Sequence, residues 1–211
     1  MGTAALPIAI SVAAAAIVGI AIGVAFHARL AGSSAAGAVA TPALHGQATW
    51  EAGQRAAPAF ALRDQHGRRI TLASFRGRPI ALTFLDSLCK SSCSIEGRML
   101  ASAIGQVGSA PRTQLLVVSV DPGGDTPRSV EHAALKWKLP AGTIWLLGTR
   151  AQLKPVWDAY QITVEPVSGD IVHSTAVYLL DKRGFERAGF LMPFVPALVA
   201  DDLLVLGAEA Q

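Results

Sequence analysis

The stretch "PIALTFLDSLCKSSCSIEGRMLASAIGQV" (79–107) sets the pattern for the whole domain. Its first part, "PIALTFLD" (79–86), is a nearly continuous apolar run, which is typical of a central strand buried on both faces. Its last part, "SIEGRMLASAIGQV" (94–107), has the apolar spacing of a helix. Both cysteines of the chain, Cys89 and Cys93, lie between these parts. The stretch therefore predicts a strand, a cysteine-bearing loop at its carboxyl end, and a helix.

The same alternation continues toward the C-terminus. Two further apolar runs, "TQLLVVSV" (113–120) and "TIWLLG" (143–148), predict buried strands. A helix is expected after each of them. The first should start near Asp125 or Thr126, with Pro127 in its first turn, and Pro155 should limit or kink the start of the second.

Hairpins flank this alternating region. The residues on both sides of Asp-Gln-His-Gly in 60–72 alternate between apolar and polar, which predicts a small hairpin. A late hairpin is expected from strands at 171–181 and 185–191, followed by a closing helix at 196–210. Strands alternating with helices, then a hairpin and a helix, predict an α/β sandwich with a mixed central sheet.

The N-terminal part has a different composition. Residues 7–26 carry no charge and are long enough to cross a bilayer as a helix. We expect a membrane anchor at 1–30, a flexible tether at 31–57 and the domain at 58–211. A cleaved signal peptide is the alternative, since "AGAVA" (36–40) offers small residues to a peptidase. Arg29 opposes an exported domain by the positive-inside rule.

Charge and composition exclude one class of partner. The 211 residues carry a net charge of +3 and are 51% hydrophobic, with the basic residues spread along the chain. A nucleic-acid-binding surface needs a dense stripe of Lys and Arg with interleaved aromatics. The sequence has no such stripe, so we expect no nucleic-acid partner.

The pair Cys89 and Cys93 has three readings: a structural disulfide, a redox dithiol, or half of a metal site. A disulfide closing so short a loop would constrain little of the unfolded chain. The start of a helix favours the thiolate, and a spacing of four puts both sulfurs on one face if the turn is helical. Lys90 adds a positive charge beside them. The pair alone leaves the three readings open.

A third partner for the cysteines has to come from the histidines. His27 and His45 lie in the expected anchor flank and tether, His66 in a hairpin turn, and His132 in a charged helix where a surface position is expected. His173 stands apart, at the start of the late strand. A structural role for that side chain is the alternative to a ligand role.

Some other polar and aromatic residues have simpler interpretations. Trp137, Trp145 and Trp157 should pack helices on the sheet. Asp201 and Asp202 should cap the final helix or face solvent. The segment "DPGGDTP" (121–127) reads as turn chemistry followed by a helix start, which would shape the loop beside the cysteines.

Taken together, four stretches resemble the Sco/SenC (PrrC) family. They are "FALRDQHGRRITLASFRGRPIALTFLD", "CKSSC", "VSVDPGGDTP" and "HSTAVYLLDKRG". The resemblance implies a thioredoxin-like, membrane-anchored, extracytoplasmic domain. It also implies Cu(I)/Cu(II) held by Cys89, Cys93 and His173. The partner would be the copper-receiving subunit of cytochrome c oxidase, or another copper or thiol protein. The family usually has Pro after each cysteine, where this chain has Lys90 and Ser94.

Two enzyme readings compete with a metallochaperone. A thiol–disulfide oxidoreductase would use Cys89 as the attacking thiolate and Cys93 as the resolving thiol. A thioredoxin, however, would have C-x-x-C and a Pro before the late strand. A peroxiredoxin would need P-x-x-x-T-x-x-C, but this chain has Leu82 and Asp86 at the Pro and Thr positions. We therefore expect a copper chaperone, with the dithiol oxidoreductase as the alternative.

Overall fold

The computed structural model describes residues 2, 43–109 and 112–210. Within this part of the chain, an eight-stranded sheet has the order β1-β10-β9-β4-β5-β6-β2-β3. The strands are β1 (Ala48–Thr49), β2 (Ala61–Asp64), β3 (Arg69–Thr71), β4 (Ile80–Leu85), β5 (Gln114–Ser119), β6 (Ile144–Leu147), β9 (Ala176–Leu180) and β10 (Glu186–Leu191). The strands β4, β5 and β6 run parallel, whereas β9 is antiparallel to β4. The predicted mixed sheet is confirmed.

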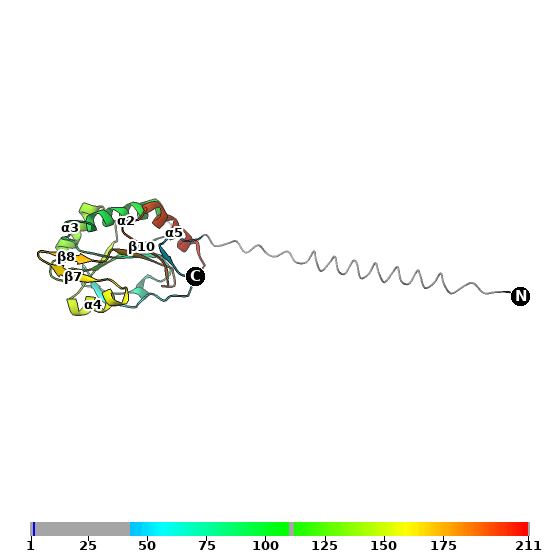
Figure 1. Cartoon of the computed structure of the whole chain (residues 1–211), viewed down its shortest axis with the longest axis horizontal. Helices are drawn as coiled ribbons and strands as arrows, with labels where there is room; N and C mark the ends of the chain where they lie inside the picture. The colour runs from blue at the N-terminus through cyan, green and yellow to red at the C-terminus, as the bar shows by residue number, and fades with distance from the viewer. Residues whose placement is uncertain (1, 3–42, 110–111, 211) are drawn as a thin grey trace. The chain divides into compact units, whose positions relative to one another are not determined.

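Helices cover both faces of this sheet. The helices α2 (Cys93–Val107), α3 (Pro127–Trp137) and α5 (Pro196–Ala208) lie on one face, and α4 (Arg150–Ala159) lies on the other (Figure 1). A 3-10 helix, η1 (Leu72–Phe75), joins β3 to the loop before β4. The helix α3 begins as predicted, with Thr126 as its N-cap in a capping box and Pro127 in its first turn.

The strand β4 is buried on both faces, as its apolar run predicts. Ala81 and Leu85 belong to the core beneath α2, α3 and α5, while Leu82 and Phe84 belong to the core beneath α4. The helix α2 packs closely on α3. The Trp137 ring fills the space beside Gly97, where an added Cβ would lie only 2.7 Å from it. The end of β4 and the start of α2 are therefore held firmly in place.

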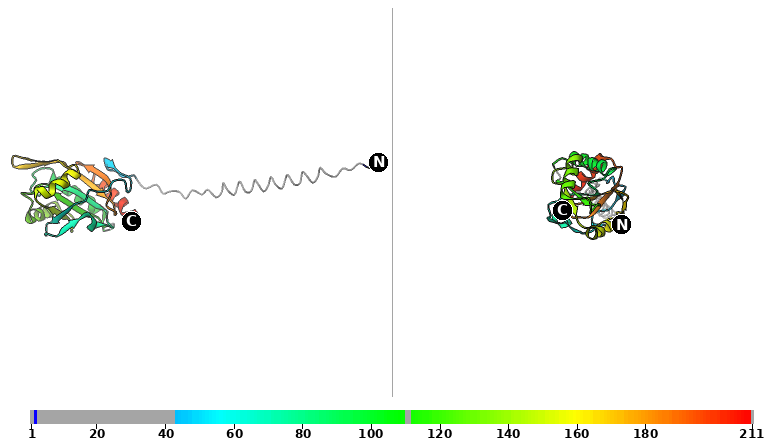
Figure 2. Two further views of the ribbon diagram at one scale, coloured as in Figure 1. Left: turned by 90° about the horizontal axis from the view of Figure 1, so that it is seen from below. Right: turned by 90° about the vertical axis from the view of Figure 1, so that its left-hand side faces the viewer.

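The late strand predicted at 171–181 is wrong in one respect: it is two strands. The strand β8 (Asp170–His173) pairs with β7 (Val164–Val167) in a separate hairpin, and only then does β9 begin. The break falls at Ser174, whose N–H donates to Thr163 O (3.0 Å) and so closes the hairpin. The hairpin projects past the helices (Figure 2). His173 is therefore the last residue of β8, and Ser174 and Thr175 separate it from β9.

Residues before Pro58, expected to be part of the tether, contribute to the sheet. The strand β1 pairs with β10, and Trp50 N–H donates to Arg187 O (3.0 Å). The predicted span at 7–26 lies outside the described residues. Among the residues that are described, no helix is both long enough and apolar enough to cross a bilayer.

The prediction for Asp202 is wrong, whereas the prediction for the tryptophans is confirmed. Asp202 is fully buried and accepts hydrogen bonds from the N–H of His45 (2.9 Å) and from its ring Nδ1 (2.7 Å). A carboxylate can be buried when donors satisfy it in this way. Trp137, Trp145 and Trp157 are all buried between helices and sheet.

Candidate metal or dithiol site

The two cysteines lie where the carboxyl end of β4 meets α2. Cys93 is the first residue of α2 and is fully buried, whereas Cys89 lies in the preceding loop and is partly exposed. Both are free thiols. This edge of a parallel sheet is where α/β proteins usually place their sites, because loops and helix starts gather there.

Hydrogen bonds make Cys89 the more acidic thiol of the pair. The N–H of Cys93 donates to Cys89 Sγ (3.4 Å), and the Ser91 hydroxyl lies 3.6 Å from the same sulfur. A bond from the Cys93 thiol, together with main-chain N–H groups, outweighs burial and lowers the pKa of Cys89 to about 5. The bond to Cys89 and burial raise the pKa of Cys93. Cys89 is thus a thiolate at neutral pH, and Cys93 keeps its proton.

His173 faces the buried sulfur. Its Nε2 lies 3.4 Å from Cys93 Sγ, and its Nδ1 lies 2.9 Å from the carbonyl oxygen of Ser174. A carbonyl only accepts hydrogen bonds, so Nδ1 carries the proton. The lone pair of Nε2 then points toward Cys93. This is the arrangement in which histidines bind metals, with the far nitrogen fixed by a main-chain carbonyl.

A fully buried carboxyl group, Glu96, lies one helical turn beyond Cys93. Burial raises its pKa to about 7 despite the contact with the Thr83 hydroxyl. That hydroxyl also lies 3.1 Å from the carbonyl oxygen of Ala176. A hydroxyl has one proton, so both contacts are hydrogen bonds only if Glu96 is protonated and donates to Thr83. The geometry and the raised pKa both favour the protonated carboxyl group below about pH 7.

Asp125, in the segment "DPGGDTP", ties the cysteine loop to the rest of the domain. Its carboxylate accepts from the N–H of Ser87 (2.8 Å) and from the Ser119 hydroxyl (2.5 Å). Ser87 also donates from its hydroxyl to Ser129 Oγ (2.9 Å). Burial raises the pKa of Asp125 to about 6, against these bonds. The segment has more than a turn's role, because it fixes the loop two residues before Cys89.

The structure brings the three predicted site residues together, but it leaves them in an open arrangement. Cys93 contacts both Cys89 and His173. Within the described ranges 43–109 and 112–210, no three Cys, His, Asp or Glu side chains already stand in a metal-binding geometry. A metal ion would therefore have to draw the two sulfurs and the imidazole closer together. Two thiolates and an imidazole are the ligands that suit copper.

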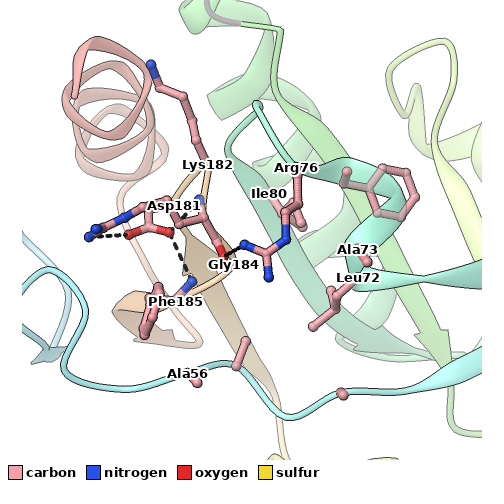
Figure 3. A pocket seen from close by; sticks show the side chains of 13 residues that line it. Ala56, Leu72, Ala73, Arg76, Ile80, Asp181, Lys182, Gly184 and Phe185 are labelled. Atoms are coloured by element: carbon pink, nitrogen blue, oxygen red, sulfur yellow. Dashed lines mark hydrogen bonds and ion pairs between the residues drawn. The ribbon is translucent and has the colours of Figure 1, made fainter. Parts of the chain in front are cut away.

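A separate pocket lies at the other end of β4, away from the cysteines. It is lined by Ile80, the first residue of that strand, and by the turn after β9 (Figure 3). Arg76 donates to the carbonyl oxygen of Arg183 (2.6 Å), and Asp181 accepts from the N–H of Phe185 (3.0 Å). These bonds hold the turn closed. None of the three site residues lines this pocket.

Comparison with known proteins decides the family. Residues 49–202, more than half of the chain, match the family model described as SCO1/SenC. The chain belongs to the SCO1/SenC family. The predicted resemblance is confirmed.

Solved structures agree with this fold. ScoI of Bradyrhizobium japonicum with copper bound is 25% identical, with a TM-score of 0.61, and 70% of this chain covers 97% of that one. ScoI of Arabidopsis thaliana with copper bound is 22% identical, with a TM-score of 0.65, over 71% and 96% of the two chains. BsSco, described as a Sco-family cytochrome c oxidase assembly protein with a disulfide switch, is 16% identical, with a TM-score of 0.64, over 77% and 100%. The thioredoxin-like fold is confirmed.

A curated relative comes from a different branch of thiol proteins. Chloroplastic peroxiredoxin Q of Populus jackii is 24% identical over 152 residues, which are 72% of this chain and 66% of that protein. The match spans just under two thirds of the peroxiredoxin. At the positions that the peroxiredoxin pattern requires to be Pro and Thr, this SCO1/SenC chain has Leu82 inside β4 and the buried Asp86.

Proposed function

We propose that this chain is a copper-binding assembly protein for cytochrome c oxidase, holding copper through Cys89, Cys93 and His173. The supporting observation is the His173 ring. Its Nδ1 is fixed by the Ser174 carbonyl, and its Nε2 faces Cys93 Sγ at 3.4 Å. An unprotonated Nε2 that faces a cysteine sulfur is the atom through which a histidine binds a metal ion. Family membership and the copper-bound ScoI structures support the same function.

The chemistry of the cargo follows from the ligands. Two thiolates are soft donors and favour Cu(I), and an imidazole completes a site that also accepts Cu(II). Cys93 must lose its proton when copper binds, and its raised pKa makes this the costly step. Copper binding should therefore release protons, and it should strengthen as the pH rises.

The test is copper binding by the purified full-length protein. The wild type should hold one copper ion per chain, measured by metal analysis and by competition with a Cu(I)-specific colorimetric chelator. Cys89→Ser or Cys93→Ser should lose tight Cu(I) binding, because one thiolate and one imidazole make a poor Cu(I) site. The matched control is His132→Ala, which changes an exposed histidine of α3 and should bind as the wild type does. Wild-type protein that binds no copper would overturn the proposal.

Membrane anchoring and an extracytoplasmic domain are part of the same proposal. The uncharged run at 7–26 is long enough for a span, and a SCO1/SenC family lipoprotein of Bacillus anthracis shares the fold, with a TM-score of 0.67. A phosphatase fused to the C-terminus should be active in cells. Activity only from a cytoplasmic reporter would contradict this, and would favour the topology indicated by Arg29.

The acidic Cys89 thiol supports a second candidate, a thiol–disulfide oxidoreductase. The Cys89 thiolate would attack a partner disulfide, the partner's other sulfur would leave as a thiolate, and Cys93 would then displace the reduced partner to form the Cys89–Cys93 disulfide. The relative with a disulfide switch is consistent with such chemistry. Loss of partner oxidation control in Cys93→Ser, with normal copper handling in His173→Ala, would favour this function.

A further inference from the structure

Two large apolar side chains stand exposed in the segment that carries the cysteines. Leu88, directly before Cys89, is 55% exposed, and Ile95, in the first turn of α2, is 49% exposed. Single exposed apolar residues need no explanation. Here, however, two of them lie within seven residues of each other, and Cys89, the accessible member of the cysteine pair, lies between them in the sequence.

Leu88 is held in this exposed position by its neighbours. Its N–H donates to Asp86 Oδ1 (2.6 Å), and a Cβ built on Gly124 would lie 2.8 Å from its Cδ1. The Leu88 side chain therefore lies against the Gly124 backbone. A partner that covers an exposed leucine at this position removes apolar surface from water.

Carboxylates surround these apolar residues. The same Cβ on Gly124 would meet the carboxylate of Asp121, so Asp121 and Leu88 lie against one backbone position. Asp170 begins β8, the strand that ends at His173. Asp170 is therefore three residues before the histidine whose ring faces Cys93.

This negative charge has little local compensation. Across the described ranges, neither Asp121 nor Asp170 makes an ion pair with an Arg, Lys or His. Lys90, beside Cys89, is the one basic side chain within the cysteine loop itself, residues 86–92. A positively charged partner surface would supply what the site lacks.

The accessible sulfur decides what kind of partner is needed. Cys93 is fully buried, so an incoming ligand reaches the site through Cys89. Copper leaves a thiolate site when another soft ligand replaces it, and a disulfide is exchanged only by direct sulfur–sulfur contact. Either step brings a partner cysteine against Cys89. An interface of standard size covers about 800 Å² on each side, which includes Leu88 and Ile95.

We propose that Leu88 and Ile95, with Asp121 and Asp170, form a docking surface around Cys89. It fits a protein that presents a cysteine pair from an apolar surface bordered by Lys and Arg. The identity of the probe below rests on the proposed function, but the docking chemistry does not require copper. The apolar pair supplies contact area at the centre, and the two carboxylates orient the partner and speed its approach.

The test measures docking without any metal. The full-length protein in detergent carries Cys93→Ser, which removes its own resolving thiol. The probe is the soluble copper-receiving domain of cytochrome c oxidase from the same organism, with one cysteine of its pair replaced by Ser and the other activated as a mixed disulfide with thionitrobenzoate, so that no second probe thiolate can reverse the reaction. The Cys89 thiolate attacks the probe sulfur, that S–S bond breaks, and thionitrobenzoate leaves as a thiolate. The rate of mixed-disulfide formation is followed by non-reducing gel electrophoresis.

In this background, Leu88→Ser with Ile95→Ser should slow capture of the probe about tenfold, because a factor of ten corresponds to the loss of a modest apolar contact. Asp121→Asn with Asp170→Asn should slow capture at low salt and leave it unchanged at high salt. The control Leu135→Ser, at a 75% exposed position on α3, should have no effect. All variants should react normally with a small-molecule disulfide.

Three results would overturn the proposal. One is capture of the probe at the wild-type rate by the Leu88 and Ile95 double variant. Another is an equal slowing with the small-molecule disulfide, which would mean that the substitutions alter Cys89 itself. The third is capture of the probe no faster than capture of an unrelated protein that carries the same mixed disulfide. The docking test contains no metal, so its result does not depend on whether the protein binds copper. The docking proposal and the copper-binding proposal can therefore be refuted independently.

Discussion

The turn after β2 and the loop after β4 begin in the same way. Asp64 is buried and accepts the N–H of His66 (2.9 Å), and Asp86 is buried and accepts the N–H of Leu88 (2.6 Å). In both, an aspartate at the end of a strand organises the next two residues through its side chain. The sequences therefore look like two examples of one turn.

The two regions differ in the charges around the aspartate. Arg68 donates to Asp64 Oδ2 (2.7 Å), and this bond, with main-chain donors, outweighs burial and lowers the pKa of Asp64. Asp86 makes no ion pair with an Arg or Lys of the described part of the chain. Burial, and then the charges of Asp121, Cys89 and Asp170, raise its pKa. The surroundings therefore favour the ionised form of Asp64 and oppose the ionised form of Asp86.

The raised pKa of Asp86 is shared by other carboxyl groups near the cysteines, and also by Glu186 on β10, where burial outweighs its ion pair with Arg55. Glu96 and Asp125, which lie near the cysteines, have raised pKa values like Asp86. A region that holds several carboxyl groups without cations gives up folding stability at neutral pH. A bound cation would favour the ionised form of these groups and so lower their pKa values. That is the electrostatic setting we expect of a site that receives a metal ion.

The largest expected effect concerns Glu96. Its pKa of about 7 in the folded protein is above the ordinary 4.5, so stability falls as the pH rises through this range and is lowest above it. At roughly 1.4 kcal/mol per unit, the loss is about 3 kcal/mol. Glu96→Gln should remove this loss, and it should make the protein more stable than the wild type at about pH 8 by a similar amount. Urea unfolding at acidic and alkaline pH measures it.

The matched control for Glu96→Gln is Glu131→Gln, an exposed site on α3, which should leave the pH profile of stability unchanged.

The turn after β2 should show a pH dependence of stability of the opposite sign. Asp64→Asn should cost roughly 1 kcal/mol, since the Arg68 side chain is largely exposed and its ion pair is partly screened. The contribution of Asp64 is present above its ordinary pKa of 3.8 and is lost as the pH falls through its lowered value. Equal pH profiles for the two variants would refute the comparison.

The smallest effect is a shift in thiol reactivity. Alkylation of Cys89 in the metal-free protein should depend on pH with a midpoint of about 5. Cys93→Ala removes the thiol that donates to Cys89, so the midpoint should rise by about one unit or more. Ser91→Ala should shift it less, because the Ser91 hydroxyl is a weaker contributor. A wild-type midpoint near the ordinary 9.0 would contradict the hydrogen-bond account.

Much of the fold could be predicted from local patterns, because the apolar runs of β4, β5 and β6 and the cap at Thr126 carry their own signals. The cysteine pair was visible for the same reason. The position of His173 was not, because its side chain is directed by the pairing of β8 with β7, which is a tertiary feature. The burial of Asp202 depends on His45, more than 150 residues away. The hydrogen bond from the Ser87 N–H to Asp125 also joins two loops that are distant in the sequence. The only signal for it in the sequence is the acidic residue in the segment "DPGGDTP".

The central claim, that His173 completes a copper site with the two cysteines, is tested most directly by X-ray absorption of the copper-loaded protein. The wild type should show two sulfur ligands and one nitrogen ligand. His173→Ala should lose the nitrogen, lose Cu(II) binding, and hold Cu(I) about tenfold more weakly or worse, as removal of a metal ligand predicts. His132→Ala should match the wild type. An unchanged copper spectrum and affinity in His173→Ala would contradict the account.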